Sequence, residues 1–467
     1  MPKPSNPSVF DPYAGNVLVQ SMGPILSRAE VSKRLLVMPP RPPANIQSIP
    51  REVRMHMVMM IRDLHIPQLE ELRLHESADL MMRQNYRYLE PTSPKTWGLI
   101  SGEPSQIARR SWAPAFGAAA EGISGSGKSV AIHGCLSLYP QVVRHKTFFR
   151  MVDGLTQVVW LSAEVPPSGR APDLAVTLMN ALMKATGNTR FEKTIAGNWR
   201  NGMQMLEEWR QVATAHFLGV LHLDEVQNFF KIGTLESRRK RKAGEYAPEL
   251  SIVEDQCLKW ILSLMNTWQI PLLVSGTPDG IGALTKRLSN TQRIVTSGYH
   301  AFKHFTEVDD PAFRKVLLPQ LGAYQYVKTP LPIDDALAEL IMEKTAGVPR
   351  LIIALWIAAH RVALERTTDD LRLADFRKAA DTYLSPVGPA VAALRSNDPL
   401  RMARYEDLVP KDHTFWTQFW GDGFGLRAPV HPWRDQLFQR FCQAALDRVT
   451  GLGVGAVALG SARRMTG

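Results

Sequence analysis

The stretch Gly122-Ile123-Ser124-Gly125-Ser126-Gly127-Lys128-Ser129 decides the fold of this chain. Its three glycines let the backbone curl so that successive N–H groups point at one anion, as in loops that cradle phosphates. Lys128 is then placed to reach the β- and γ-phosphates of a nucleotide, and the Ser129 hydroxyl to bind Mg²⁺. Small apolar residues precede the octet at 116–120, and a helical pattern follows it at 130–138. The sequence therefore predicts a strand, a phosphate-binding loop and a helix in succession.

The nucleotide-binding residues expected from this motif are Gly122, Ser124, Gly125, Ser126, Gly127, Lys128, Ser129 and Val130.

A pair of acids, Asp224-Glu225, follows a continuous apolar run at 217–223, the pattern of a strand buried on both faces of a sheet. Asp224 is expected to hold the hydration shell of Mg²⁺ at the carboxyl edge of the sheet, together with Ser129. Glu225 is expected to orient the attacking water. The alternative is an acidic pair that caps the next helix. The glycine-rich loop and the two acids together predict a chain that binds ATP or GTP with Mg²⁺.

Composition limits the remaining possibilities. At 467 residues the chain is long enough for two or three domains. No apolar run reaches the ~20 residues of a membrane span, and the N-terminus lacks the apolar region of a secretory signal. Three widely spaced cysteines are typical of a reducing cytoplasm, which is the expected location. A net charge of +11 favours a polyanionic partner such as nucleic acid.

Changes in composition divide the chain into four regions. We expect an N-terminal arm with a small helical region at 1–100, a nucleotide-binding domain at 101–310, an α-helical lid at 311–410 and an aromatic extension at 411–467. Strand candidates lie at 116–121, 157–163, 218–224 and 271–276, with helical stretches between them. This alternation predicts an α/β fold with a parallel sheet flanked by helices.

Three further features lie in a set order after the acids. A strand pattern at 273–278 ends in small hydroxyl residues, and Thr277 is suited to sense the γ-phosphate beside Asp224. Arg293, with Arg287 as second choice, could reach a nucleotide held by a neighbouring subunit. Arg350 opens a helix and could touch the phosphates in its own subunit. Taken singly, these features have plainer alternatives: a buried strand end, surface charge and a proline at a helix start.

In this order and spacing, the motifs resemble the AAA+ ATPase layout of Walker A, Walker B, sensor 1, arginine finger and sensor 2. The resemblance implies ATP hydrolysis with Mg²⁺. The residues that it implies for catalysis are Lys128, Asp224, Glu225, Thr277 and Arg293.

Further stretches between about 80 and 410 resemble the TnsC/TniB family, AAA+ regulators of target selection in bacterial transposons. The first is the stretch from Arg83 to Pro91, where Asn85 stands in place of a glycine that is frequent in the family. The others are Ser275-Gly276-Thr277-Pro278, Gly347-Val348-Pro349-Arg350 with the following residues 354–363, and segments at 384–396 and 405–408. The resemblance implies a ring or helical filament of this chain on double-stranded DNA. It also implies a TnsB-like DDE transposase and a TniQ/TnsD-like target selector as partners, often with a TnsA-like endonuclease, and oligomers that disassemble on hydrolysis.

Two segments are candidates for contacts with partners. The basic run Arg238, Arg239, Lys240, Arg241 and Lys242 is a candidate DNA contact, the alternative being a solvated charge run. Six aromatic residues at 411–436 form either a stripe that packs on the lid or a partner-docking tail. Two other classes of protein remain open. An AAA+ replication initiator or helicase loader would carry a C-terminal helix-turn-helix. A nucleotide sensor or a small-molecule P-loop kinase would not need Arg293, Arg350 or the basic run.

Overall fold

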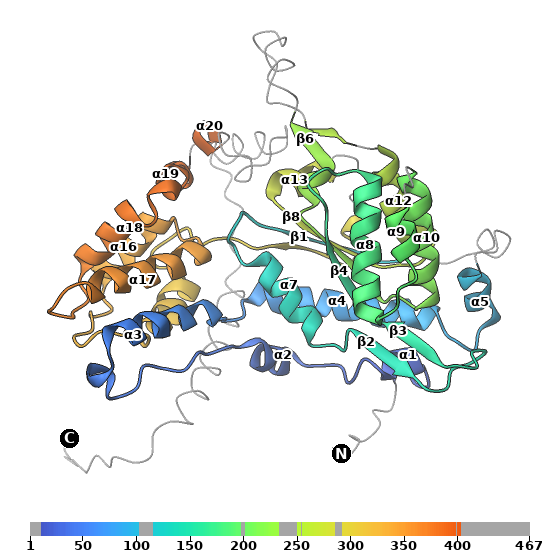
Figure 1. Cartoon of the computed structure of the whole chain (residues 1–467), viewed down its shortest axis with the longest axis horizontal. Helices are drawn as coiled ribbons and strands as arrows, with labels where there is room; N and C mark the ends of the chain where they lie inside the picture. Colours follow the sequence, from blue (N-terminus) through green and yellow to red (C-terminus); the bar gives the residue numbers. More distant parts are fainter. Residues whose placement is uncertain are drawn as a thin grey trace, which may run out of the picture.

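A computed structural model of the chain describes residues 11–101, 115–197, 201–232, 250–253, 255–284, 292–397 and 399–402. Its centre is a five-stranded parallel sheet in the order β4-β5-β8-β1-β9 (Figure 1). In that order, the strands are β4 (Trp160–Glu164), β5 (Val220–Asp224), β8 (Leu272–Gly276), β1 (Gly117–Glu121) and β9 (Gly298–Ala301). The register pairs Glu121 with Gly276 and Glu164 with Asp224, so the carboxyl ends of these strands share one edge. The predicted α/β fold with a parallel sheet is confirmed.

The sheet differs from the expected strands in two places. The apolar run at 157–163 divides between β3 (Leu155–Val158), which pairs antiparallel with β2 (Val142–His145), and β4 in the central sheet. The break falls inside an unbroken apolar run, so hydropathy does not mark it. The edge strand β9 was not expected, because its sequence Gly-Tyr-His-Ala has little of the apolar pattern of a buried strand. A second small hairpin joins β6 (Phe230–Ile232) to β7 (Leu250–Ile252).

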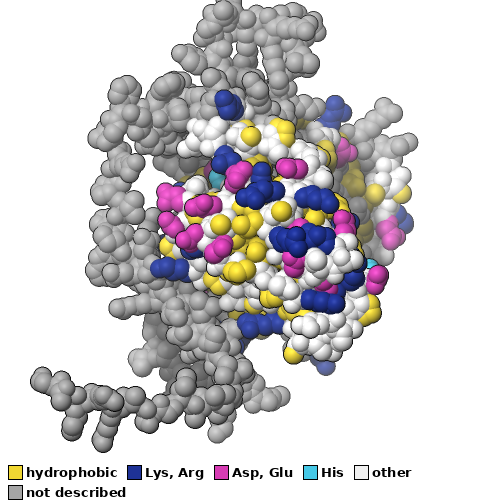
Figure 2. Space-filling model, turned by 90° about the vertical axis from the view of Figure 1, so that its left-hand side faces the viewer, with side chains coloured by type: hydrophobic (Ala, Val, Ile, Leu, Met, Phe, Trp, Pro, Cys, Tyr) yellow, Lys and Arg dark blue, Asp and Glu magenta, His cyan; other side chains and the backbone are white. Residues whose placement is uncertain are grey.

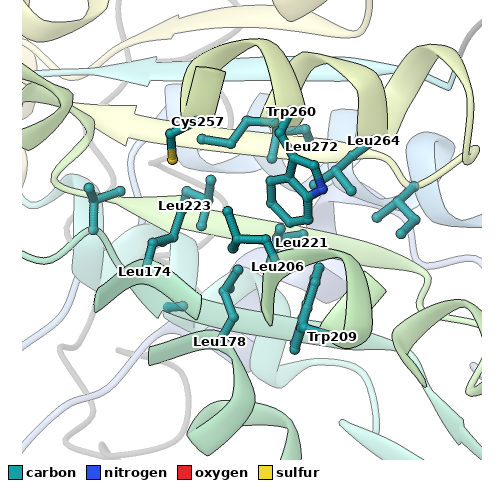
Figure 3. Close-up of a cluster of buried hydrophobic side chains, with 14 of the residues drawn as sticks. Leu174, Leu178, Leu206, Trp209, Leu221, Leu223, Cys257, Trp260, Leu264 and Leu272 are labelled. Atoms are coloured by element: carbon teal, nitrogen blue, oxygen red, sulfur yellow. The ribbon is translucent and has the colours of Figure 1, made fainter. Parts of the chain in front are cut away.

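One face of the sheet packs against α8 (Ala171–Thr186), α10 (Gly202–Ala215) and α12 (Asp255–Asn266). Figure 3 shows side chains from these helices meeting those of β5 and β8. The rings of Trp209 and Trp260 meet edge to face, with centroids 6.0 Å apart. Shorter helices on this body are α5 (Pro94–Ile100), α9 (Glu192–Ala196) and α13 (Pro278–Leu284).

The opposite face packs against α7 (Lys128–Ser137) and the long helix α4 (Leu69–Tyr88). The Arg83–Tyr86 stretch, part of the family resemblance, lies in α4 and has a structural role. Arg83 is buried and pairs with Asp79 at 2.8 Å. The Tyr86 hydroxyl donates to the Phe217 carbonyl at 2.9 Å. Because α4 shares its hydrophobic cluster with α7 and the sheet, it is packed as part of the nucleotide-binding body.

The N-terminal segment runs along the nucleotide-binding body and on to the helical lid that begins at residue 311 (Figure 1). Its helices are α1 (Val17–Gln20), α2 (Arg28–Leu35), η1 (Ile46–Ser48), α3 (Arg51–Val58) and η2 (Met59–Asp63). Buried residues of α1 and α2 join the cluster beneath the sheet, whereas Val58 and Ile61 join the core of the lid. Arg54 of α3 is buried and pairs with the Asp369 carboxylate at 2.5 Å. Burial alone would raise the pKa of Asp369, but the hydrogen bonds from Arg54 help to lower it overall.

The described residues of the lid form helices joined by loops, with one isolated bridge between Thr329 and Asp370. Its helices are η4 (Ala312–Leu317), α15 (Leu318–Gly322), α16 (Asp335–Thr345), α17 (Pro349–Leu364), α18 (Leu373–Thr382), η5 (Ser385–Val387), α19 (Gly388–Ser396) and α20 (Pro399–Met402). Figure 2 views this end of the molecule, where hydrophobic side chains lie between a group of basic and a group of acidic side chains. The proposed division of the chain into four regions stays a prediction.

Within the described part of the chain, no single helix has both the length and the hydropathy of a membrane span. The pair α16 and α17 passes that test only jointly, and the two helices are bent by 116° where they meet.

Candidate functional site

The glycine-rich octet forms a tight loop between β1 and α7. Gly125 and Gly127 have φ angles of 85° and 96°, a left-handed conformation that other residues rarely adopt. A Cβ at position 122 would lie 2.3 Å from the Ser126 hydroxyl oxygen, so glycine is required there for space. The loop ends at Lys128, the first residue of α7, whose positive dipole end therefore points into the curl. This is the geometry of an anion cradle.

The two residues expected at the metal lie in contact. Ser129 Oγ donates to Asp224 Oδ2 at 2.7 Å, while the other carboxylate oxygen accepts from Ser275 Oγ at 2.5 Å and from the Glu225 N–H at 2.9 Å. Burial alone would raise the pKa of Asp224. The hydrogen bonds donated by Ser275, Ser129 and the Glu225 N–H favour the charged form, and this pKa is lowered overall, so the group is a carboxylate.

Magnesium fits this donor set. Mg²⁺ prefers oxygen ligands, and a hydroxyl and a carboxylate oxygen meet here beside the loop. Ser126 Oγ is buried and lacks a hydrogen-bond partner in the described part of the chain, as expected of a group that faces a polar ligand. The residues present therefore suit a nucleotide phosphate with its metal.

Glu225 directly follows Asp224 and has an unusual backbone. Its φ angle is 56°, in the left-handed region. It stands at the N-cap of the 3₁₀ helix η3 (Val226–Phe229), but its side chain accepts no capping hydrogen bond. The carboxylate instead accepts from the Gln227 side-chain amide. Burial is the main cause of the raised pKa of Glu225, opposed by Lys128 and reinforced by Asp224. The geometry thus gives no support to the helix-cap alternative for this residue.

Thr277 is placed differently from the expectation. Its hydroxyl donates to Asp279 at 2.5 Å, and the hydroxyl beside Asp224 belongs to Ser275, two residues earlier. The Thr277 N–H donates to Gln227 Oε1 at 3.2 Å, so Gln227 connects this strand end to Glu225. Ser275 and Gln227 are therefore site residues that the motif reading missed. Alternation from Leu273 places Ser275 and Thr277 on the same side, so it does not separate them; the end of β8 at Gly276 does.

His222 is a third residue that the motifs did not mark. It lies on β5 two residues before Asp224 and is fully buried. Burial lowers the pKa of the His222 ring to about 4, so the ring is neutral. Its two nitrogens lie 2.8 Å from Ser162 Oγ and 2.8 Å from Ser275 Oγ.

The lid meets the loop at the start of α17. The Arg350 N–H donates to the Gly125 carbonyl at 3.3 Å, and a Cβ at Gly125 would lie 3.1 Å from the Arg350 Cβ. The Gly347 carbonyl accepts from the Phe305 N–H at 3.0 Å, which fixes the turn that precedes the helix. The Arg350 side chain is exposed and stands beside the loop.

Arg293 lies at the opposite edge of the sheet. Its carbonyl would be 2.6 Å from a Cβ on Gly117, the first residue of β1, whereas the loop follows the last residue, Glu121. Five strand residues span about 17 Å. Arg293 is exposed. It is therefore remote from the loop of its own chain.

Several expected residues lie outside the described part of the chain. They are Arg287, the basic run Arg238, Arg239, Lys240, Arg241 and Lys242, the segment at 405–408 and the aromatic extension at 411–467.

An apolar pocket of about 130 Å³ adjoins the loop. Its walls come from residues 64–68 before α4, from η4 and from the start of α17, with Ser126 and Gly127 on the side of the loop. A mostly apolar wall with few polar groups is the usual lining for a flat ligand. One polar group there is the buried Glu71, which lies 3.0 Å from His65. The pocket suits a nucleobase whose phosphates occupy the loop.

A P-loop nucleotide-binding protein is defined by these features together: the anion cradle, the acid pair, the parallel sheet and the adjoining pocket. The protein family described as "AAA domain" matches residues 118–284, which include the loop, the acids and the strand β8. The chain therefore contains an AAA domain, the nucleotide-binding module of AAA+ ATPases. No curated protein matches this chain.

Solved structures similar to this chain share little sequence with it. The Aeropyrum pernix ORC1 protein in complex with DNA is 13% identical, covers 79% of this chain and 87% of its own, and has a TM-score of 0.38. Drosophila ORC bound to DNA is 14% identical, covers 93% of this chain and 90% of its own, and has a TM-score of 0.38. A Thermotoga maritima RuvB variant is 14% identical over 62% of this chain and 65% of its own, with a TM-score of 0.31. Similarity at this level carries no inference about what the chain binds.

Proposed function

We propose that this chain is an ATP-dependent regulator of DNA transposition. It oligomerises on duplex DNA, links a TniQ/TnsD-like target selector to a TnsB-like transposase, and disassembles when ATP is hydrolysed. The AAA domain and the TnsC-like motifs of the sequence support this proposal. The observation that carries it is the contact of the lid with the loop, at Arg350 and Gly125. A nucleotide bound in the loop contacts both the nucleotide-binding body and the lid, so its hydrolysis changes how these two parts are placed relative to each other.

Within the site, each group has a separate task. Lys128 and the loop N–H groups bind the phosphates, and Mg²⁺ when bound neutralises charge on the β- and γ-oxygens. Asp224, already ionised, faces that metal position together with Ser129. Glu225 orients the attacking water, and its raised pKa makes the carboxylate a stronger base toward the proton of that water.

Replacement of Glu225 by Gln is expected to retain ATP binding but slow hydrolysis about 100-fold, because an amide cannot accept the proton of the attacking water. Single-turnover release of phosphate measures the rate, and equilibrium titration the affinity. The matched control is Glu192→Gln, on α9, which should keep the parent rate. A Glu225→Gln variant that hydrolyses ATP at the parent rate would show that Glu225 is not the residue that activates water.

Neutralising the basic run, from Arg238 to Lys242, tests the DNA-binding part of the proposal. Electron microscopy of the parent chain with ATP and duplex DNA should show rings or filaments that either component alone does not give. In the neutralised variant, each lost phosphate contact should flatten the plot of log affinity against log salt by about 0.9. The weakening should be similar for all DNA sequences, since phosphate contacts do not read bases.

ATP affinity serves as the internal control for that variant, and it should equal the parent value because the run lies outside every nucleotide motif. Unchanged DNA affinity and salt slope would remove this run from the DNA site. A parent chain that forms no ATP-dependent assembly on DNA would overturn the proposed function itself. A DDE transposase gene beside the gene for this chain would separate the transposition role from that of a replication initiator or helicase loader.

A further inference from the structure

Three neighbouring strands of the sheet each place one polar residue on the same face. Ser162 of β4 pairs in register with His222 of β5, and Ser275 lies on the adjacent strand β8. The residues two positions earlier on β5 and β8, Val220 and Leu273, are buried in the hydrophobic cluster beneath α7. His222 and Ser275 are both fully buried. Apolar residues would be expected at these positions, so the polar row needs a reason.

The row forms a chain of hydrogen bonds with one direction. Ser275 Oγ donates its proton to Asp224 Oδ1 at 2.5 Å, because a carboxylate can only accept. Ser275 Oγ can then only accept from His222, so His222 Nε2, 2.8 Å away, carries a proton and donates it. The other ring nitrogen, Nδ1, accepts from Ser162 Oγ at 2.8 Å. Every donor in the row therefore points toward Asp224.

We propose that His222 is a positioning residue for the metal site: through Ser275 it holds the Asp224 carboxylate in the orientation that receives Mg²⁺. The proposal rests on the proposed function of the site as an ATP and Mg²⁺ site. Ser275 occupies one carboxylate oxygen and leaves Oδ2 directed at Ser129, the other expected metal-binding residue. The neighbouring helix confines the ring from the other side, with the His133 ring edge-on at 5.9 Å.

Outer groups of this kind act on a metal through the ligands that they orient. Aligned hydrogen bonds polarise one another, so the donation by Ser275 is stronger when His222 donates to it. Replacing such an outer partner of a metal ligand typically costs 10- to 100-fold in metal affinity. A role in packing alone would instead reduce stability and nucleotide affinity whether or not metal is present.

The test separates the metal from the nucleotide. The affinity for a fluorescent ATP analogue is titrated in EDTA and then as a function of Mg²⁺ concentration. His222→Leu, which fills the space without a donor, should raise the Mg²⁺ concentration for half-maximal effect about 10-fold. Its affinity in EDTA should stay within about twofold of the parent, a factor worth only ~0.4 kcal/mol. Ser275→Ala should give a similar shift, and it tests the row independently if the leucine variant fails to fold.

Two further variants test the route through Ser275. His222→Gln keeps an amide donor near the position of Nε2 and should return the Mg²⁺ requirement most of the way to the parent value. The double variant His222→Leu/Ser275→Ala should need no more Mg²⁺ for half-maximal effect than whichever single variant needs more, because both substitutions remove the same interaction. Three results would each overturn the proposal. The shifts in Mg²⁺ requirement could add in the double variant, His222→Leu could keep the parent Mg²⁺ dependence, or His222→Leu could lose as much nucleotide affinity in EDTA as with Mg²⁺. A parent chain that binds no nucleotide with Mg²⁺ would instead overturn the proposed function.

Discussion

A Lys128→Ala variant is expected to bind ATP about 1000-fold more weakly than the parent and to form no assemblies on DNA. Lys128 is the one cation of the octet, and its side chain is buried beside the cradle, 6% exposed. The phosphates would then face the loop N–H groups without that charge, while Asp224 and Glu225 remain nearby. Loss of one partner from a buried charge pair costs roughly 2–5 kcal/mol, and 4 kcal/mol corresponds to about 1000-fold in affinity.

Titration with a fluorescent ATP analogue measures this loss, and electron microscopy on duplex DNA reports the assembly. The matched control is Lys184→Ala, an exposed lysine in the last turn of α8, which should bind ATP as the parent does. Both variants should unfold at the parent temperature if the effect is local. Normal ATP-dependent oligomers of Lys128→Ala would rule out the octet as the nucleotide site.

The sequence predicted those parts of the fold that local patterns encode. The octet requires glycine at the left-handed positions 125 and 127, and the apolar run that ends at Asp224 reads as a buried strand. Both predictions depend on residues adjacent in the chain. The edge strand β9 was missed because it is held by pairing with β1, which its own residues do not reveal. The break between β3 and β4 was missed for the same reason, since one apolar run joins two different sheets.

At the site, the sequence identified residue types more reliably than contacts. It placed Ser129 and Asp224 at one metal, and the structure brings them to 2.7 Å. It chose Thr277 as the hydroxyl beside Asp224, but β8 ends at Gly276, so Thr277 lies past the strand and Ser275, inside it, contacts that carboxylate. The pocket beside the loop was not predicted, because its walls come from segments more than 200 residues apart. Such contacts follow from tertiary packing, and no spacing rule along the chain encodes them.

Arg293→Ala is expected to reduce ATP hydrolysis about 1000-fold, the size of effect known for arginines that stabilise charge in the transition state. Arg293 lies at the amino edge of the sheet, about 17 Å of strand from the loop of its own chain, and it is exposed. An effect on hydrolysis therefore requires a nucleotide held by another subunit. The matched control is Gln292→Ala, the exposed neighbour, which should keep the parent rate.

Mixing variants tests whether this arginine acts in trans. A Lys128→Ala chain lacks the nucleotide but carries Arg293, whereas an Arg293→Ala chain binds the nucleotide but lacks the arginine. Neither variant should hydrolyse ATP alone, and the mixture should recover part of the parent rate, because mixed interfaces pair an intact loop with an intact arginine. Recovery should rise with the fraction of Lys128→Ala chains and pass through a maximum. Unimpaired turnover by Arg293→Ala would transfer the role to Arg287, and loss of turnover without recovery on mixing would contradict an action of Arg293 in trans.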